Sequence, residues 1–457
     1  MKKSEINLGE GKIGAMLLRL SVPAILSQIV NLLYNIVDRI YIGKLPDGHM
    51  AMAGLGIAMP IVMLISAFSL LIGIGGAPLA AIQMGKQKND EAEKILSNSF
   101  SLLLISSAVL MTVFMIFKIP ILRMFGADDD TISYAADYTA VYLFGTAFVQ
   151  FTLGLNPFIN TQGYTKTGML SVLIGAVANI ILDPIFIYGL KMGVKGAALA
   201  SVVAQFLSML WVLNFLFGNK TKIKVRKHYI KLDFKIIKQI LSLGIAPFIM
   251  YGSESIILIA LNRQLLEYGG NIAVSSMTIM SSLTQIIVLP LLGLAQGAQP
   301  ILSYNLGANK IERVKKTFEK LFISCLSYSV IIVAAFMLFS KQTVMIFNSN
   351  ADLVSVTSKA MKIYFAGIFI FGAQIACQQT FLALGKAKQS LILVVLRKLI
   401  LLVPLIYILP IFMENKYNAV LLAEPITDIV STLITIICFW KFYSQNLKIK
   451  TVKQANC

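Results

Sequence analysis

The sequence has few charged residues for its length. Of 457 residues, only 13% are Asp, Glu, Lys or Arg, whereas 57% are hydrophobic. A soluble domain carries about 25% charged and about 45–50% apolar residues, so this composition excludes an ordinary soluble protein. Apolar runs long enough to cross a bilayer recur along the chain, for example at 52–79, 102–117 and 390–413. The chain is therefore predicted to be a polytopic membrane protein.

Cysteine and histidine are scarce as well. The four cysteines have no paired spacing, and three lie in apolar spans, which excludes a disulfide framework. The two histidines, His49 and His228, lie in predicted loops and form no metal cluster. Because no Ser-His arrangement, His/Glu metal pair or nucleotide motif is present, we predict neither an enzyme nor a cofactor. The basic, polar N-terminus has no signal-peptide cleavage pattern.

Acidic residues are outnumbered by basic ones, 21 to 40, which gives a formal net charge of +19. We do not expect nucleic-acid binding, because no aromatic-interleaved basic domain lies outside the apolar runs. The basic residues instead gather in loops on one side, with eight in the segment 218–239. Loops on the cytoplasmic side of membrane proteins carry this excess, so both termini are predicted to be cytoplasmic and the chain to lie in the cell membrane.

We predict an all-α integral membrane protein with twelve transmembrane helices. Continuous apolar runs of this length favour helices over strands. The predicted spans are 17–42, 51–75, 96–118, 134–159, 168–190, 195–217, 240–263, 274–297, 317–339, 358–383, 389–413 and 417–441.

The two halves of the chain repeat at an offset of 222 residues, at which GAPLAAIQMGKQK (76–88) resembles AQPILSYNLGANK (298–310). The same register aligns Gly75/Gly297, Pro78/Pro300, Gly85/Gly307, Tyr142/Tyr364 and Gly145/Gly367. Six spans in each copy predict a parallel repeat, that is, two six-helix bundles facing each other across a central cavity. The predicted units are an N-lobe (1–217), a basic cytoplasmic linker (218–239), a C-lobe (240–441) and a cytoplasmic tail (442–457). This architecture favours a transporter that works by alternating access.

Polar residues recur on one face of the first span, at Gln28, Asn31, Asn35 and Asp38. Lipid cannot satisfy these groups, so the face is predicted to look into the bundle or a wet cavity. The alternative is a set of hydrogen bonds that merely holds the helices together. Arg39 points about 100° away and either snorkels or pairs with Asp38.

A second acid lies in the fifth span, where Asn179 and Asp183 are one helical turn apart. Ser201, near the outer start of the sixth span, and Asp38 are predicted to lie at a similar depth. Two carboxylates, an amide and a hydroxyl suit a proton or a sodium ion, because two close carboxylates cannot both ionise cheaply. The alternative is a kink at Pro184 in which Asp183 caps freed backbone groups.

The C-lobe carries its own acids, Glu254 in the seventh span and Glu424 and Asp428 in the twelfth. Two interpretations stay open. The acids either bind a cationic substrate or pair with Arg263 or Arg397 of their own lobe.

Three motifs in combination carry a family resemblance over nearly the whole chain: YNIVDRIYIG (34–43), NIILDPIFIYGL followed by GAALASVVAQ, and the paired GxxPxxxxxxG segments ending the second and eighth spans. The chain resembles the multidrug and toxic compound extrusion (MATE) family, in particular the branch with the staphylococcal multidrug exporters. The resemblance implies a V of two six-helix lobes. It also implies export of cationic and amphipathic compounds in exchange for H⁺ or Na⁺.

The family's N-lobe cation site carries over onto Asp38, Asn179, Asp183 and Ser201, the last position being often Thr in relatives. The tenth span has no acid, which argues against the C-lobe sodium site of one branch and favours coupling through the N-lobe. The expected substrate cavity is lined by Gln28, Asn31, Tyr34, Asn35, Asn156, Glu254, Glu424 and Asp428.

Two functions are weighed. The leading one is secondary active export of organic cations by antiport with H⁺ or Na⁺, by a monomer in the lipid bilayer. The alternative is a flippase for lipid-linked saccharides, which shares the broad architecture but usually needs a cavity rich in Arg and Lys.

Overall fold

The computed structural model describes residues 7–348 and 350–448, and the regular elements of these residues are all helices. Most of the predicted cytoplasmic tail, from residue 449 on, lies outside the described residues, as does 1–6. In the described part, nine helices are long and apolar enough to cross a membrane, and two bent helix pairs pass the same criterion together. One of the nine helices, α9 (Phe234–Gly307), turns back on itself, so the described residues supply twelve candidate membrane spans.

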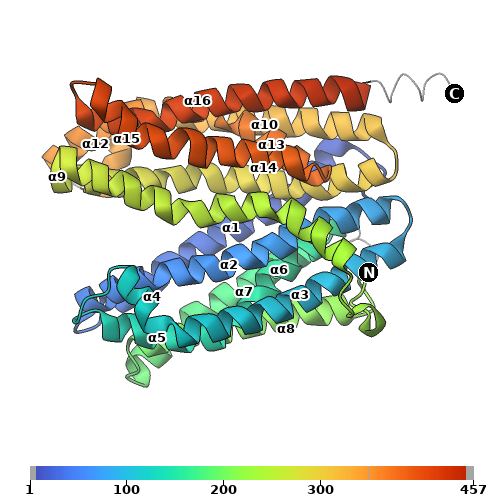
Figure 1. Ribbon diagram of the computed structural model, residues 1–457, viewed down its shortest axis with the longest axis horizontal. Helices are drawn as coiled ribbons and strands as arrows, with labels where there is room; N and C mark the ends of the chain where they lie inside the picture. Colours follow the sequence, from blue (N-terminus) through green and yellow to red (C-terminus); the bar gives the residue numbers. More distant parts are fainter. Residues whose placement is uncertain (1–6, 349, 449–457) are drawn as a thin grey trace.

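The N-terminal half forms one bundle, drawn in blue to green in Figure 1. Its elements are α1 (Ile13–Gly43), α2 (Gly48–Gly85), α3 (Asn89–Ile116), α4 (Lys118–Met124), α5 (Ile132–Phe144), α6 (Thr146–Thr161), α7 (Thr165–Pro184), the π-helix η1 (Ile185–Gly189) and α8 (Val194–Phe217).

The C-terminal half forms the second bundle, drawn in yellow to red and lying beside the first. After the 3₁₀ turn η2 (Lys227–Tyr229), its elements are α9 (Phe234–Gly307), α10 (Ile311–Leu338), α11 (Ser340–Met345), α12 (Ala351–Tyr364), the 3₁₀ turn η3 (Ile368–Ile370), α13 (Phe371–Ala383), α14 (Ala387–Val395), the π-helix η4 (Leu396–Leu402), α15 (Val403–Phe412), α16 (Lys416–Phe442) and the π-helix η5 (Tyr443–Lys448).

Helix α9 holds two predicted spans, because its 74 residues would extend about 110 Å if it were straight. The reversal lies at Gly270, whose φ of 64° and ψ of −163° are not helical. Glycine adopts such a backbone conformation without the steric cost of a Cβ atom. Figure 1 shows the two arms of α9 running side by side.

The fourth and tenth spans were predicted as continuous helices, and this was wrong in detail. The pair α5 and α6 is bent by 59°, and the pair α12 and η3–α13 by 53°. The bends lie at Gly145 and Gly367, which the repeat aligns. A methyl group at Gly145 would lie 2.7 Å from a methyl carbon of Val202, and one at Gly367 would lie 2.6 Å from the Cα of Pro425. Each bend therefore brings a glycine against a neighbouring helix.

The two lobes touch backbone to backbone at one end, through glycines that the repeat also aligns. Gly85 faces the backbone of Tyr304, and Gly307 faces that of Ile82. Residues 82 and 304 are themselves 222 apart, so this is one contact repeated by a pseudo-two-fold axis. Gly244 of α9 likewise packs against the backbone of Leu71 in α2. These close approaches need residues without a side chain.

The basic segment between the lobes is anchored to the N-lobe. The side-chain oxygen of Gln162 accepts hydrogen bonds from Thr221 Oγ1 at 2.7 Å, from Lys222 N at 2.7 Å and from Ile223 N at 3.2 Å. Arg226 Nε donates to Glu93 Oε2 at 2.7 Å. Helix α9 begins at Phe234, so the end of the predicted linker is already helical.

Candidate functional site

The acids predicted for the N-lobe site come together in the structure. Asn179 Nδ2 donates to Asp183 Oδ1 at 3.2 Å and to Ser201 Oγ at 3.3 Å, which joins α7 to α8. Helix α1 packs along α7, and the carboxylates of Asp38 and Asp183 lie close enough to interact electrostatically. Asp38 is 7% exposed, and Asp183 is fully buried.

Local sequence explains how α7 presents this pair. Asn179 and Asp183 share a face one turn apart. Pro184 has no N–H to donate to the carbonyl of Ile180, and the regular α-helix ends there in favour of the π-helix η1. The π-helical turn is a rare element that often occurs at functional sites. The predicted kink is thus a change of helix type directly after the acid.

Three oxygens of this cluster are buried with no hydrogen-bond donor from the described residues: Asp38 Oδ1, Asn179 Oδ1 and Asp183 Oδ2. A buried, unsatisfied acceptor costs about 1–3 kcal/mol, and more when it is charged. Oxygen atoms of this kind are the ligands that a hard cation prefers, and either carboxylate can take up a proton. The cluster lacks the three or more His, Cys, Asp or Glu side chains of a typical metal centre, and none is found elsewhere among the described residues.

Sequence reasoning missed one neighbour of this cluster. Tyr138 of α5 is 3% exposed and lies near the carboxylate of Asp38 and the hydroxyl of Ser201. Its ring stacks on that of Tyr142, with centroids 5.9 Å apart. The repeat pairing of Tyr142 with Tyr364 pointed to this helix, but no motif marked Tyr138 itself.

The remaining polar residues predicted in the N-lobe are spread along the bundle. Gln28, Asn31 and Tyr34 on α1 are half-buried, whereas Asn35 is exposed. Asn35 Nδ2 donates to the backbone carbonyl of Asn31 at 2.7 Å. Asn156 of α6 is engaged between helices: its Nδ2 donates to the Gly168 carbonyl at 2.9 Å and to Ser171 Oγ at 2.6 Å.

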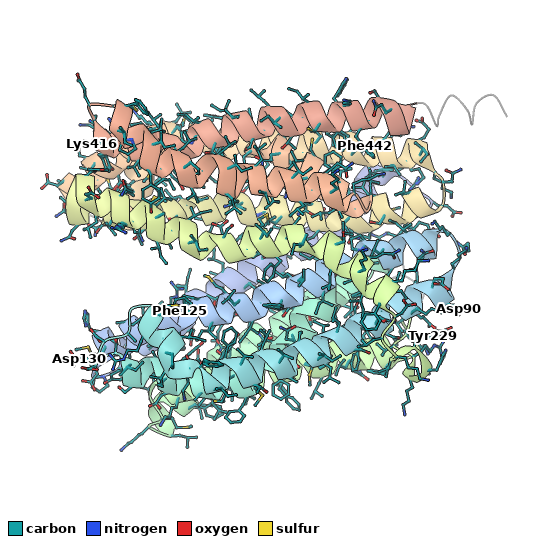
Figure 2. The ribbon with its side chains drawn as sticks, viewed as in Figure 1. Asp90, Phe125, Asp130, Tyr229, Lys416 and Phe442 are labelled. Carbon is teal, nitrogen blue, oxygen red and sulfur yellow. The ribbon has the colours of Figure 1, made fainter. Side chains whose placement is uncertain are left out.

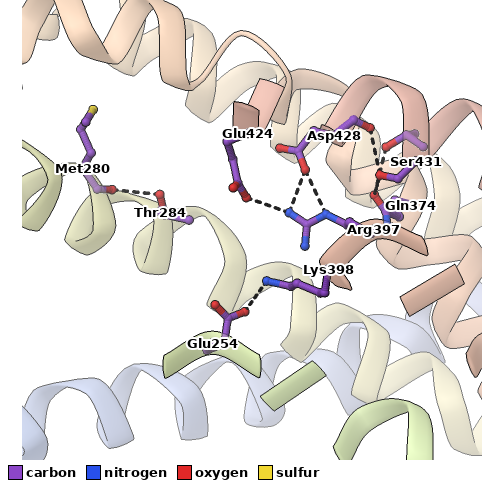
Figure 3. A network of polar contacts seen from close by, with 10 residues as sticks. Glu254, Met280, Thr284, Gln374, Arg397, Lys398, Glu424, Asp428 and Ser431 are labelled. Atoms are coloured by element: carbon purple, nitrogen blue, oxygen red, sulfur yellow. Dashed lines mark hydrogen bonds and ion pairs between the residues drawn. The ribbon is translucent and has the colours of Figure 1, made fainter. Parts of the chain in front are cut away.

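The acids predicted for the C-lobe form an ion-pair network, shown in Figure 3. Arg397 Nη2 donates to Asp428 Oδ1 at 2.7 Å and to Glu424 Oε1 at 3.1 Å, and its Nε donates to Asp428 Oδ1 at 3.0 Å. Lys398 Nζ donates to Glu254 Oε1 at 2.6 Å. Of the two interpretations left open by the sequence, the structure shows pairing with Arg397 for the acids of α16, whereas binding of a cationic substrate by these acids stays a prediction. Arg263 instead lies on the exposed surface of α9.

Lys398 was not singled out from the sequence, although a basic Arg-Lys pair in the middle of an apolar run was a usable signal. Both bases lie in the π-helix η4, two residues or fewer from its start. Pro404 follows shortly after and cannot donate to the carbonyl of Ile400, which favours an irregular helix at this point.

A cavity of about 460 Å³ lies against this network. Its charged lining consists of Glu254, Arg397, Lys398, Glu424 and Asp428. Most of the other lining residues are apolar or carry amides, and one of them, Met63 of α2, comes from the N-lobe. Ligand pockets for drug-sized compounds are about 300–1,000 Å³ with mostly apolar walls and a few polar groups, and this cavity has that character.

Comparisons with known proteins concern the family and the fold. The sequence profile of the family described as MatE matches residues 23–185 and 247–408. The chain is 24% identical over 400 residues to multidrug export protein MepA of Staphylococcus haemolyticus, with 88% of each chain covered. It is also 24% identical over 420 residues to MepA of Staphylococcus aureus strain MSSA476, with 92% of each covered.

Among solved structures, the outward-facing conformation of a multidrug resistance MATE family transporter of the MOP superfamily superposes with a TM-score of 0.89. The sequence identity is 24%, and the superposition covers 96% of this chain and 97% of that one. This likeness establishes the fold, and one of the two profile segments lies in each half of the chain.

Proposed function

The chain belongs to the MatE family of transporters, and on that premise we propose that it is a secondary active multidrug exporter. The proposed substrates are organic cations and amphipathic compounds, and the proposed driving force is inward movement of H⁺ or Na⁺. The name of the relatives, multidrug export protein, supports this substrate range. Such a protein would lie in the cell membrane as a monomer and contribute to antibiotic resistance.

One observation carries the proposal: three buried acceptor oxygens of Asp38, Asn179 and Asp183 have no donor among the described residues. A proton on either carboxylate would supply the missing donor, and a sodium ion would replace the missing donors by coordination. In both cases the cluster needs a cation from outside the protein. The residues that would hold it are Asp38, Asn179, Asp183 and Ser201.

The coupling step follows from the position of Asp38 on α1. This helix belongs to the N-lobe, yet its first turns pack into the C-lobe core through Met16, Leu17 and Leu20. A change in charge at Asp38 therefore acts on a helix that contacts both lobes. Ion and substrate would bias the same two-state equilibrium, which is the thermodynamic requirement for antiport.

Orientation is proposed from the basic loops. The lobes touch at the end where α2 meets α3 and α9 meets α10; Lys310 lies in the second of these connections, and Arg313 lies in the first turn of α10. If that end is cytoplasmic, the conformation described here is closed toward the cytoplasm, and the ion site near the opposite end would receive its ion from outside.

The test uses inside-out vesicles that contain the full chain and a fluorescent organic cation such as ethidium. A pH gradient and a sodium gradient are imposed separately. We expect uptake driven by one of the two in the wild type and none in Asp38→Asn. The control is Asp137→Asn, which removes a carboxylate of α5 that is 48% exposed and pairs with Lys195 at 3.3 Å. Asp38→Asn that reaches the membrane and still accumulates ethidium would refute the coupling role.

The flippase alternative gains no support from the cavity. Its two bases, Arg397 and Lys398, are already neutralised by three carboxylates. A pyrophosphate would have to displace carboxylates that are bound at 2.6–3.1 Å. No uptake of ethidium under either gradient, together with movement of a lipid-linked sugar, would restore that alternative.

A further inference from the structure

The two ion-pair systems of the C-lobe differ in how firmly they are held. Arg397 donates twice to Asp428 and once to Glu424, and its guanidinium lies 4.5 Å from the ring centre of Phe371. The Asp428 side chain is 1% exposed and those of Arg397 and Glu424 are 11% and 12% exposed. Several simultaneous contacts in a closed environment make this first system a fixed structural unit.

The pair of Lys398 and Glu254 is built differently. A single contact joins Nζ to Oε1, and the Glu254 side chain is 55% exposed whereas that of Lys398 is 7% exposed. Both residues line the 460 Å³ cavity, and Figure 3 shows Glu254 reaching up to Lys398 from α9. The carboxylate can therefore swing away toward the cavity, but the ammonium stays where it is.

Because Glu254 is exposed and Lys398 is buried, the charge of a ligand determines whether it can separate the two side chains. A compound that carries only a positive charge can take the Glu254 carboxylate, but it leaves the Lys398 ammonium buried without a counter-charge. Breaking a buried pair by removing one partner is strongly unfavourable, because the remaining charge has lost its water and gains nothing in return. A compound that carries only a negative charge leaves Glu254 without its partner and meets two further carboxylates close by.

A compound that carries both charges avoids this cost. Its ammonium can bind Glu254 while its carboxylate binds Lys398, so both protein charges keep a partner and the net charge of the cavity does not change. The apolar walls, which include Ile257, Leu261 and Phe371, can cover the rest of the molecule. A volume of about 460 Å³ admits a drug-sized compound.

We propose that the Glu254–Lys398 pair is an exchangeable receptor for zwitterionic amphiphiles, which insert a cationic group and a carboxylate between the two side chains. This inference rests on the proposed export function and narrows its substrate class at the C-lobe cavity. Lys398 acts as the specificity-determining residue, because it disfavours monocations and recognises the carboxylate. The ion pairs of Arg397 with its two acids stay in place when a ligand binds.

The test measures binding, not transport, so it gives an answer even if export fails. The purified full chain is placed in lipid nanodiscs without any gradient. Two probes are compared by fluorescence anisotropy: a rhodamine with a free benzoate, which is a zwitterion, and its methyl ester, which is a monocation. We expect the wild type to bind the zwitterion about tenfold more tightly, which corresponds to about 1.4 kcal/mol.

The variants separate the two charges. Lys398→Gln removes the buried ammonium, so the preference should be lost or reversed in favour of the ester. The charge-swapped double variant Glu254→Lys with Lys398→Glu keeps a pair in the cavity and should keep the preference for the zwitterion, which guards against a single variant that fails to fold. Lys195→Gln is the control, because this lysine belongs to an exposed pair on the N-lobe.

Equal binding of the two probes by the wild type, no binding of either probe, or an unchanged preference in Lys398→Gln would each overturn the inference. Loss of ethidium export with an intact zwitterion preference would instead count against the proposed export function alone.

Discussion

The contact between the lobes makes a prediction about a single methyl group. In Gly244→Ala the new Cβ atom would overlap the carbonyl oxygen of Leu71 and lie 2.7 Å from its carbonyl carbon. Carbon atoms pack best at about 3.5–4.0 Å, so α2 and α9 must separate by about 1 Å at this point. Both partners are helix backbone, which cannot move aside as a flexible side chain would.

The energetic consequence can be bounded. Overpacking of this kind costs about 1–3 kcal/mol in the conformation that contains the contact. A conformation in which the lobes part at this end does not bear that cost. The ratio of the two populations should therefore shift by about 5- to 150-fold toward the parted conformation. The higher helix propensity of alanine, about 1 kcal/mol, favours both conformations equally and cancels.

The measurement is a distance distribution between two spin labels by pulsed electron paramagnetic resonance. Cysteines at Asp130 and Lys416, in a background without the four native cysteines, place the labels on different lobes at the end away from the contact, as Figure 2 shows. If the lobes rock, the short-distance fraction should grow in Gly244→Ala. The control is Gly252→Ala on the same helix, where a methyl group meets no atom within 4 Å. Identical distributions for both variants, in protein that melts as the wild type does, would refute the reasoning.

The structure makes further predictions about stability. Arg397→Gln leaves the carboxylate of Asp428, which is 1% exposed, without its cation, so the free energy of unfolding in detergent should fall by about 3–5 kcal/mol. The matched change Arg123→Gln removes an ion pair whose side chains are 45% and 91% exposed, so it should lower the free energy of unfolding by less than about 1 kcal/mol. Equal losses of stability in the two variants would contradict this prediction. Gln162→Leu removes the acceptor of three hydrogen bonds from 221–223, so limited trypsin digestion should cut the basic segment faster than in the wild type. Unchanged cleavage would mean that this anchor is dispensable.

The fold could be predicted from the sequence because a bilayer permits few alternatives. Length and hydropathy indicate the spans, and the repeat at 222 residues indicates two bundles. The bends at Gly145 and Gly367 were missed, since a glycine inside an apolar run has the same hydropathy whether its helix is straight or bent. The aligned glycines at 85 and 307 were found as a pattern, but their reason, a symmetric contact with Tyr304 and Ile82, needed the structure.

The two sites differed in how many of their contacts could be predicted from the sequence. Asn179 and Asp183 are one turn apart, so helical geometry alone brings them together. Their neighbours Asp38 and Ser201 were predicted from a similar depth in the membrane, and the family resemblance implied the same four residues. Tyr138 could not be predicted, because its approach depends on how α5 packs against α8. Periodicity describes a helix face, and it does not say which other helix that face meets.

For the C-lobe acids, matching each acid to a nearby base adds information that helical periodicity alone does not give. Glu424 and Asp428 share one turn and therefore one partner, Arg397, whereas Glu254 on another helix needs a second base. The adjacent residue Lys398 points in a different direction and supplies it. In the N-lobe, by contrast, buried oxygens of Asp38 and Asp183 have no donor among the described residues. Both lobes thus bury acids, although the offset of 222 residues aligns none of them, and among the described residues it is the C-lobe acids that are held in ion pairs. On the proposed function, the N-lobe would take its cation from solution, and a bound ion there would change the relative energies of the two conformations.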